Sequence, residues 1–143
     1  MIGFNDIKTS SGVYFYVQRK YVFTSVGKVI PYQLERLNIG GAMNLATGVF
    51  TAPVNGRYQF SFVARSGAPG VAHYCNLRVN DAVIATSYAQ SYGFNMPIVS
   101  TLNLKRGDRV DVLLQSGNIL DFVNDHWTHF SGFLLEEDIN IIN

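Results

Sequence analysis

The sequence has 143 residues and a formal net charge of +1; hydrophobic residues make up 48% of it and charged residues only 15%. A chain of this length fits one domain with its own hydrophobic core, and so small a net charge gives no field that would attract nucleic acid or an anionic membrane. No apolar run approaches the roughly 20 residues of a membrane-spanning helix, so we expect neither nucleic-acid binding nor membrane insertion.

The two ends of the chain differ in composition from its middle. Residues 1–12 end in Thr-Ser-Ser-Gly and are expected to form a flexible lead-in, followed by a globular domain at 13–138 and a tail at 139–143. The first residues lack the basic and apolar regions of a signal peptide. No Gly-x-y repeat precedes the domain. We therefore expect neither a signal peptide nor a collagen-like stalk in this chain.

Strand patterns recur along the chain about every eight to twelve residues, a spacing typical of β-sandwiches and jelly rolls. No segment shows sustained helical periodicity, so the pattern predicts an all-β domain with almost no helix. Long loops are expected at 20–28, 66–71, 89–96 and 116–126. The predicted strands lie near 13–19, 29–31, 34–39, 43–46, 49–52, 57–66, 73–80, 82–88, 97–104, 108–115 and 127–135.

The most regular stretch is 47–62, with the sequence TGVFTAPVNGRYQFSF. The proline and glycine in 52–56 predict a turn between two strands. After this turn, apolar residues alternate with other residues, which predicts a strand with one buried side. The predicted buried residues are Tyr58, Phe60, Phe62 and Ala64.

This stretch resembles the signature of the globular head domain of complement C1q, a branch of the tumour necrosis factor-like jelly rolls. Similar segments follow in the family's order at 13–17, 37–41, 102–110 and 128–135, so the resemblance covers about 13–135. It implies an all-β, ten-stranded jelly-roll sandwich of two antiparallel sheets. It also implies a secreted protein that assembles as a homotrimer.

The sequence predicts no enzyme, because none of its serines lies in a Gly-x-Ser-x-Gly turn that would prepare a nucleophile. Cys75 is the only cysteine, so no disulfide can form within the chain. Its position in a predicted strand favours the role of a small buried apolar residue. An interchain disulfide or a reactive thiol is the alternative.

One predicted loop contains several oxygen donors, Asp121, Asn124 and Asp125, next to His126. Calcium prefers such ligands, and some members of the resembled family bind calcium in this region, so calcium is the one cofactor that we consider. These donors leave the coordination sphere incomplete, and an ordinary polar turn is the alternative. His126 and His129 would point to opposite faces of a strand, which argues against a shared zinc ion.

One predicted sheet carries apolar residues on the face that should meet water. Such a patch is typical of a subunit interface, and the resemblance implies a homotrimer that packs through this sheet. The alternative is that the N-terminal segment covers the face within one chain. The predicted interface residues are Tyr14, Tyr16, Gln59, Ser61, Val63, Val99, Thr101, His129 and Phe133.

The resemblance implies an extracellular, lectin-like recognition module of innate immunity that binds glycans, microbial surface patterns or proteins through loops at one end. Aromatic residues in or near the predicted loops are candidate ligand contacts, and each could instead belong to the core or an interface. The candidates are Tyr88, Tyr92, Phe94 and Trp127. Two other functions stay open: a cytokine-like or synaptic-organiser ligand that binds a receptor through the sides of the trimer, and a purely structural trimerisation domain.

Overall fold

The computed structural model describes residues 12–139, which fold into eleven strands without a helix. The strands are β1 Tyr14–Gln18, β2 Lys28–Val29, β3 Leu34–Ile39, β4 Met43–Asn44, β5 Val49–Thr51, β6 Gly56–Arg65, β7 His73–Val79, β8 Ala82–Ala89, β9 Asn95–Leu104, β10 Arg109–Ser116 and β11 His129–Glu137. The expected all-β class is confirmed. Of the predicted lead-in and tail, only Gly12 and Ile139 lie within the described residues.

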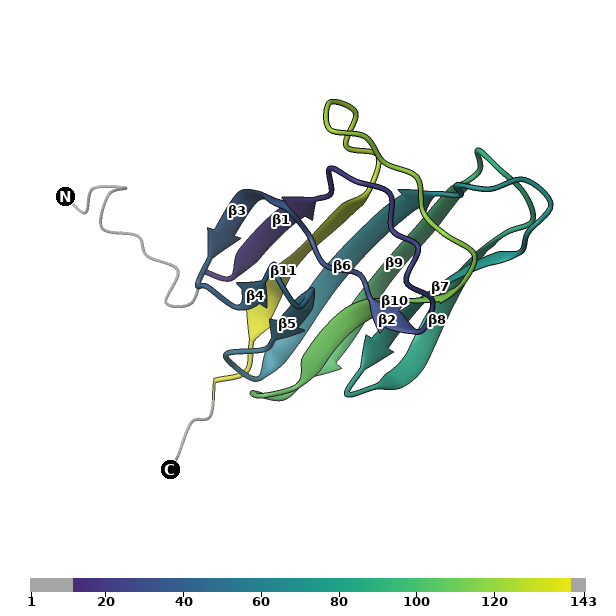
Figure 1. The fold of residues 1–143 in the computed structure, drawn as a ribbon. Helices are drawn as coiled ribbons and strands as arrows, with labels where there is room; N and C mark the ends of the chain where they lie inside the picture. The colour runs from purple at the N-terminus through teal and green to yellow at the C-terminus, as the bar shows by residue number, and fades with distance from the viewer. Residues whose placement is uncertain (1–11, 140–143) are drawn as a thin grey trace.

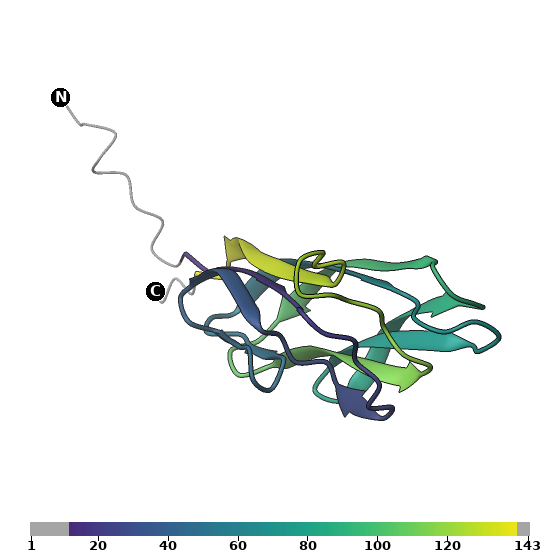
Figure 2. The same cartoon turned by 45° about the horizontal axis from the view of Figure 1, so that its top comes forward.

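The strands form two antiparallel sheets packed face to face, as Figures 1 and 2 show from two directions. Sheet A has the order β3-β1-β11-β6-β9, and sheet B has the order β4-β5-β10-β7-β8. These ten strands are the ten of the expected jelly roll. The eleventh, β2, is a two-residue strand that pairs only with Leu113 and Leu114 of β10. The expected count of ten is therefore one too low, because β2 lies off the main path of sheet B.

The core between the sheets is built around aromatic rings. Along β6 buried residues alternate with half-buried ones, which confirms the predicted inward side. Phe60 of this side meets Phe50 of sheet B with ring centroids 5.3 Å apart, and Phe15 of β1 stacks on the same Phe50 at 5.4 Å. Phe130 of β11 meets Phe15 edge-on at 5.0 Å. The rings thus join both sheets, with the offset and edge-to-face contacts that aromatic pairs favour.

Gly132 is required where β11 crosses these rings. It is buried and lies between β1 and β6, opposite Phe15 and Phe60. A Cβ atom at this position would lie 2.5 Å from Cε2 of Phe15 and 2.7 Å from Cδ1 of Phe60. These distances are well inside van der Waals contact, so only a glycine fits without displacing a ring.

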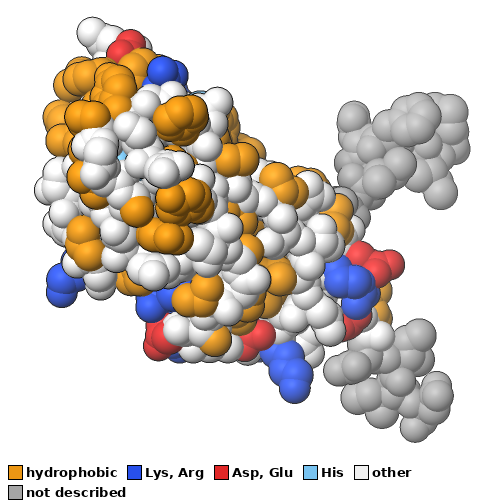
Figure 3. All heavy atoms as spheres, turned by 90° about the vertical axis from the view of Figure 1, so that its right-hand side faces the viewer, with side chains coloured by type: hydrophobic (Ala, Val, Ile, Leu, Met, Phe, Trp, Pro, Cys, Tyr) orange, Lys and Arg blue, Asp and Glu red, His pale blue; other side chains and the backbone are white. Residues whose placement is uncertain are grey.

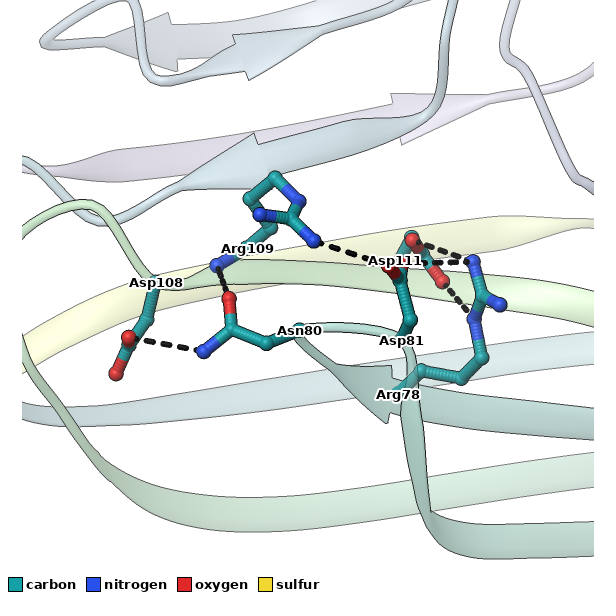
Figure 4. Close-up of polar contacts among 6 residues, drawn as sticks. All are labelled: Arg78, Asn80, Asp81, Asp108, Arg109 and Asp111. Atoms are coloured by element: carbon teal, nitrogen blue, oxygen red, sulfur yellow. Dashed lines mark hydrogen bonds and ion pairs between the residues drawn. The ribbon is translucent and has the colours of Figure 1, made fainter.

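The turn regions at one end of the sandwich are joined by polar contacts (Figure 4). Asn80 and Asp81 form the predicted tight hairpin between β7 and β8, with φ angles of 49° and 70°. The Asn80 side chain donates to Oδ1 of Asp108 at 3.0 Å and accepts from the backbone N–H of Arg109 at 2.9 Å. Arg78 forms two hydrogen bonds with the buried carboxylate of Asp111. These groups satisfy one another and join the β7–β8 hairpin to β10 and to the turn before it.

None of the described residues forms a helix that is long and apolar enough to cross a membrane. The sulfur of Cys75 lies in the core, as expected from the sequence. Burial raises the pKa of this thiol to about 12. The thiolate, which is the reactive form, is therefore scarce at neutral pH.

Candidate functional site

Four loops leave the sandwich at the same end, which we call the loop-bearing end. The last residue pairs at this end are Gln18 with His129, Arg65 with Asn95 and His73 with Ala89. The loops that follow or precede these strands therefore leave the sandwich on the same side. The loops span residues 19–27, 66–72, 90–94 and 117–128. Both ends of the described chain lie at the opposite end of the sandwich (Figure 1).

All four predicted ligand contacts lie at this end. Tyr92 and Phe94 project from the β8–β9 loop and are 50% and 57% exposed. Tyr88 is also exposed near the end of β8, where its ring packs on Tyr74 with centroids 4.8 Å apart. Trp127 is only half-buried, in the loop before β11. Viewed from this side, hydrophobic side chains are spread over the upper and middle parts of the surface, and most charged ones lie along its lower and right-hand margins (Figure 3).

The β8–β9 loop is held in place by Ser66, which is fully buried. The Ser66 hydroxyl donates to the carbonyl of Ser91 and accepts from the backbone N–H of Phe94 at 2.9 Å. The backbone carbonyl of Ser66 accepts a hydrogen bond from the N–H of Gly93, also at 2.9 Å. Phe94 is therefore fixed at its backbone while its ring is exposed, which suits a contact residue.

Arg65 is a feature of this end that sequence reasoning missed. Its guanidinium carbon lies 4.7 Å from the centroid of the Trp127 ring, and Phe122 meets the same ring edge-on at 5.6 Å. A cation over the face of an indole is a favourable arrangement. The alternation along β6 places the side chain of Arg65 on the other face of the strand from that of Ala64. Only the fold brings Trp127 beside Arg65.

Asp121, the first of the predicted calcium ligands, organises its own loop. Its side chain is 2% exposed, and its two oxygens accept hydrogen bonds from the backbone N–H groups of Phe122, Trp127 and Thr128 at 2.8–3.0 Å. Asn124 and Asp125 are exposed on the same loop. Within residues 12–139 no group of three or more His, Cys, Asp or Glu side chains could hold a metal ion. Calcium binding stays a prediction, while Asp121 has an evident structural role.

A groove of about 360 Å³ lies between residues 20–22 and residues 120–123. Its two walls are joined by reciprocal backbone hydrogen bonds between Phe23 and Ile119, each 3.0 Å long. A partial signal for this groove is present in the sequence, since the apolar residues Val22 and Phe122 lie in segments that are predicted to be loops.

Arg19 fixes the first wall of this groove. Its side chain donates to the backbone carbonyls of Tyr21, Pro31 and Val22, and its guanidinium lies 5.0 Å from the ring centroid of Phe23. Burial lowers the pKa of Arg19, although Tyr32 and Asp121 act in the opposite direction. The guanidinium of Arg19 is thus occupied by contacts within the protein and is not available to bind a ligand.

The outer face of sheet A carries the predicted interface residues in two rows. One row runs from Tyr14 through Phe133 and Gln59 to Thr101, and the next from Tyr16 through Ser131 and Ser61 to Val99. His129 and Val63 pair in the row beyond. Tyr14 and Phe133 are more than a third exposed, and Val99 is 66% exposed. Leu37 and Ile39 of β3, which are not among the predicted interface residues, are exposed and extend both rows.

Exposed apolar side chains lie on this face on β3, β1, β11 and β9, while β6 contributes Gln59, Ser61 and the half-buried Val63. The described residues leave it uncovered, although a large apolar patch of this kind is unusual on a monomer.

Comparison with known proteins identifies the family. The model of the C1q domain matches residues 14–135, which is most of the chain. The chain belongs to the C1q family. Caprin-2 from zebrafish (Danio rerio) is 33% identical over 114 residues, which are 76% of this chain and 12% of Caprin-2. This C1q domain thus spans only about an eighth of the length of that relative.

Solved structures agree with this assignment at the level of the fold. The globular domain of zebrafish complement 1qA protein superimposes with a TM-score of 0.73 at 20% identity, covering 88% of this chain and 99% of the other. Murine APRIL at pH 5.0 gives 0.71 at 11% identity, covering 87% and 100%. The C1q domain is a recognition or ligand-binding module and not an enzyme, which confirms the resemblance and the non-enzymatic class expected from the sequence.

Proposed function

We propose that this C1q domain is a secreted homotrimeric recognition module that binds glycans or proteins through its loop-bearing end. C1q domains are generally extracellular. The observation that carries the proposal is the outer face of sheet A, where Tyr14, Phe133 and Val99 stay exposed on β1, β11 and β9. Burial of apolar surface yields about 25 cal/mol per Å², so packing this face against other copies is favourable.

Assembly of three copies leaves the loops available to a ligand. The four loops project from the ends of the strands, whereas the proposed interface is the flat side of a sheet. Three identical loop-bearing ends would then face a surface together, and weak single contacts would add up through effective concentration. A repetitive target such as a microbial glycan coat suits this arrangement and gives the domain its proposed innate-immune role.

The exposed aromatic rings of the β8–β9 loop are the proposed ligand contacts. A glycan array probed with the wild-type protein and with Phe94→Ser tests this directly. Binding that is lost in Phe94→Ser but kept in Val83→Ser would support the proposal. Val83 is a suitable control because it is 53% exposed, close to the 57% of Phe94, and lies at the start of β8. Equal binding by both variants would contradict the role of this loop.

A further inference from the structure

We infer that the groove between residues 20–22 and 120–123 binds a protein partner, and that it receives a bulky apolar side chain with a carboxylate beside it. The inference rests on the proposed recognition function and names its partner class and its place on the domain. It involves residues of one chain only, so it does not depend on trimer formation.

The groove is lined mainly by apolar side chains that remain exposed. Tyr21 and Val22 on one wall are 54% and 48% exposed, and Phe122 and Val123 on the other are 49% and 52% exposed. The volume of about 360 Å³ lies within the range of small-ligand pockets. Four large apolar side chains are thus exposed around one hollow. This arrangement is typical of a site that buries an anchor side chain of a protein partner.

The side chains of Asp121 and Arg19 beneath the groove are already used by the backbone. Asp121 accepts three backbone hydrogen bonds, Arg19 donates to three carbonyls, and Phe23 and Ile119 use their backbone groups on each other. A sugar would lose the hydration of its hydroxyls in such a hollow and find few partners, which costs free energy. An apolar side chain has no such cost, so these contacts favour a protein over a glycan.

The same contacts hold the groove in its open shape. Both walls are tied together at Phe23 and Ile119, and His126 adds a hydrogen bond between its Nδ1 and the carbonyl of Arg19 at 3.0 Å. A partner would therefore meet a site that needs little ordering, and preorganisation of this kind raises affinity.

The charge of Lys20 indicates which group of the partner lies beside the inserted side chain. Lys20 lines the groove and makes no ion pair with any residue in 12–139. Its backbone N–H donates to Gln33 at 2.9 Å, which fixes the start of the loop. The one carboxylate that lines the groove, that of Asp121, is buried and used by the backbone. Among the residues that line the groove, Lys20 thus carries the one charge without an ion-pair or hydrogen-bond partner in the described chain, and a carboxylate next to the inserted side chain complements it.

The test selects a phage-displayed library of random twelve-residue peptides on the wild-type protein. We expect the enriched peptides to share an aromatic or large aliphatic residue next to Asp or Glu. Their affinities are then measured by fluorescence anisotropy on four variants. Val22→Asp and Lys20→Glu should each weaken binding about tenfold or more, equivalent to about 1.4 kcal/mol. Val83→Asp and Lys105→Glu should leave it unchanged, since both residues are exposed and lie next to strand ends opposite the loop-bearing end.

Three results would overturn the inference, and the oligomeric state separates it from the proposed assembly. Failure to enrich peptides, or peptides that bind Val22→Asp as tightly as the wild type, would show that the groove is not a protein site. Glycan-array binding that is lost in Val22→Asp and kept in Val83→Asp would assign it to glycans instead. A monomeric protein that still binds the peptides through the groove would refute the proposed assembly and leave this inference standing. A trimer without groove-dependent peptide binding would refute this inference alone.

Discussion

The phenol oxygen of Tyr16 lies 2.5 Å from Nδ1 of His129, and the two rings stack with centroids 5.6 Å apart on the outer face of sheet A. Gln18 places its amide nitrogen 3.1 Å from the same Nδ1. Arg36 donates to the amide oxygen of Gln18 at 2.7 Å, which fixes the orientation of that amide. Because Nδ1 faces an amide donor, it acts as an acceptor, and His129 is the neutral tautomer with its proton on Nε2.

Acidification should therefore destabilise the domain through His129. Burial lowers its pKa from the usual value of 6.5; His126 acts in the same direction and Asp121 opposes it. The unfolded chain then binds more protons than the folded one as the pH falls below about 6.5, so stability is lost on the acid side of that value. The melting temperature should fall between about pH 7.5 and about pH 5.5, less steeply in His129→Gln than in the wild type. An unchanged slope in His129→Gln would refute this role.

Gly132→Ala should destabilise the domain by about 1–3 kcal/mol, the usual cost of overpacking a core. The added methyl group would meet the rings of Phe15 and Phe60. Denaturant unfolding monitored by circular dichroism measures the change. Ser131→Ala, on the outer face of the same strand, adds no atoms to the core and should be close to neutral. Wild-type stability in Gly132→Ala would mean that the ring cluster can relax.

Asp121→Ala should cost at least about 1–3 kcal/mol of stability, because it leaves buried N–H donors without an acceptor. Asp125→Ala, an exposed residue of the same loop, should have little effect. Thermal unfolding of the two variants gives the comparison. Equal stability of both would show that the hydrogen bonds of Asp121 do not hold this loop.

Cys75 should be inert toward thiol reagents while the domain is folded. Its thiol is fully buried and has a pKa of about 12, so little thiolate exists at about pH 8. Labelling with a chromogenic disulfide reagent should be very slow in buffer and complete in denaturant. Fast labelling of the native protein would contradict the packing of β7.

The local patterns of this sequence were enough to predict the strands but not the contacts between loops. Alternation reveals the buried side of β6 without any knowledge of its neighbours, and the Asn80–Asp81 pair signals a hairpin by itself. The pairing of Phe23 with Ile119, which joins the two walls of the groove, connects loops from opposite halves of the chain. The contact of Arg65 with Trp127 likewise depends on the order of strands in sheet A. No local pattern encodes such contacts, so the groove emerges only from the fold.

The proposed trimer rests on the exposed face of sheet A, and the solution mass tests it most directly. Light scattering at micromolar concentration, in calcium and then in chelator, should give about three times 15.9 kDa in both conditions. Val99→Glu, which places a charge on the most exposed apolar residue of that face, should lower the mass. Dissociation on chelation would instead support calcium binding by Asp121, Asn124 and Asp125. A monomer in both conditions would contradict the trimer and, with it, recognition through avidity.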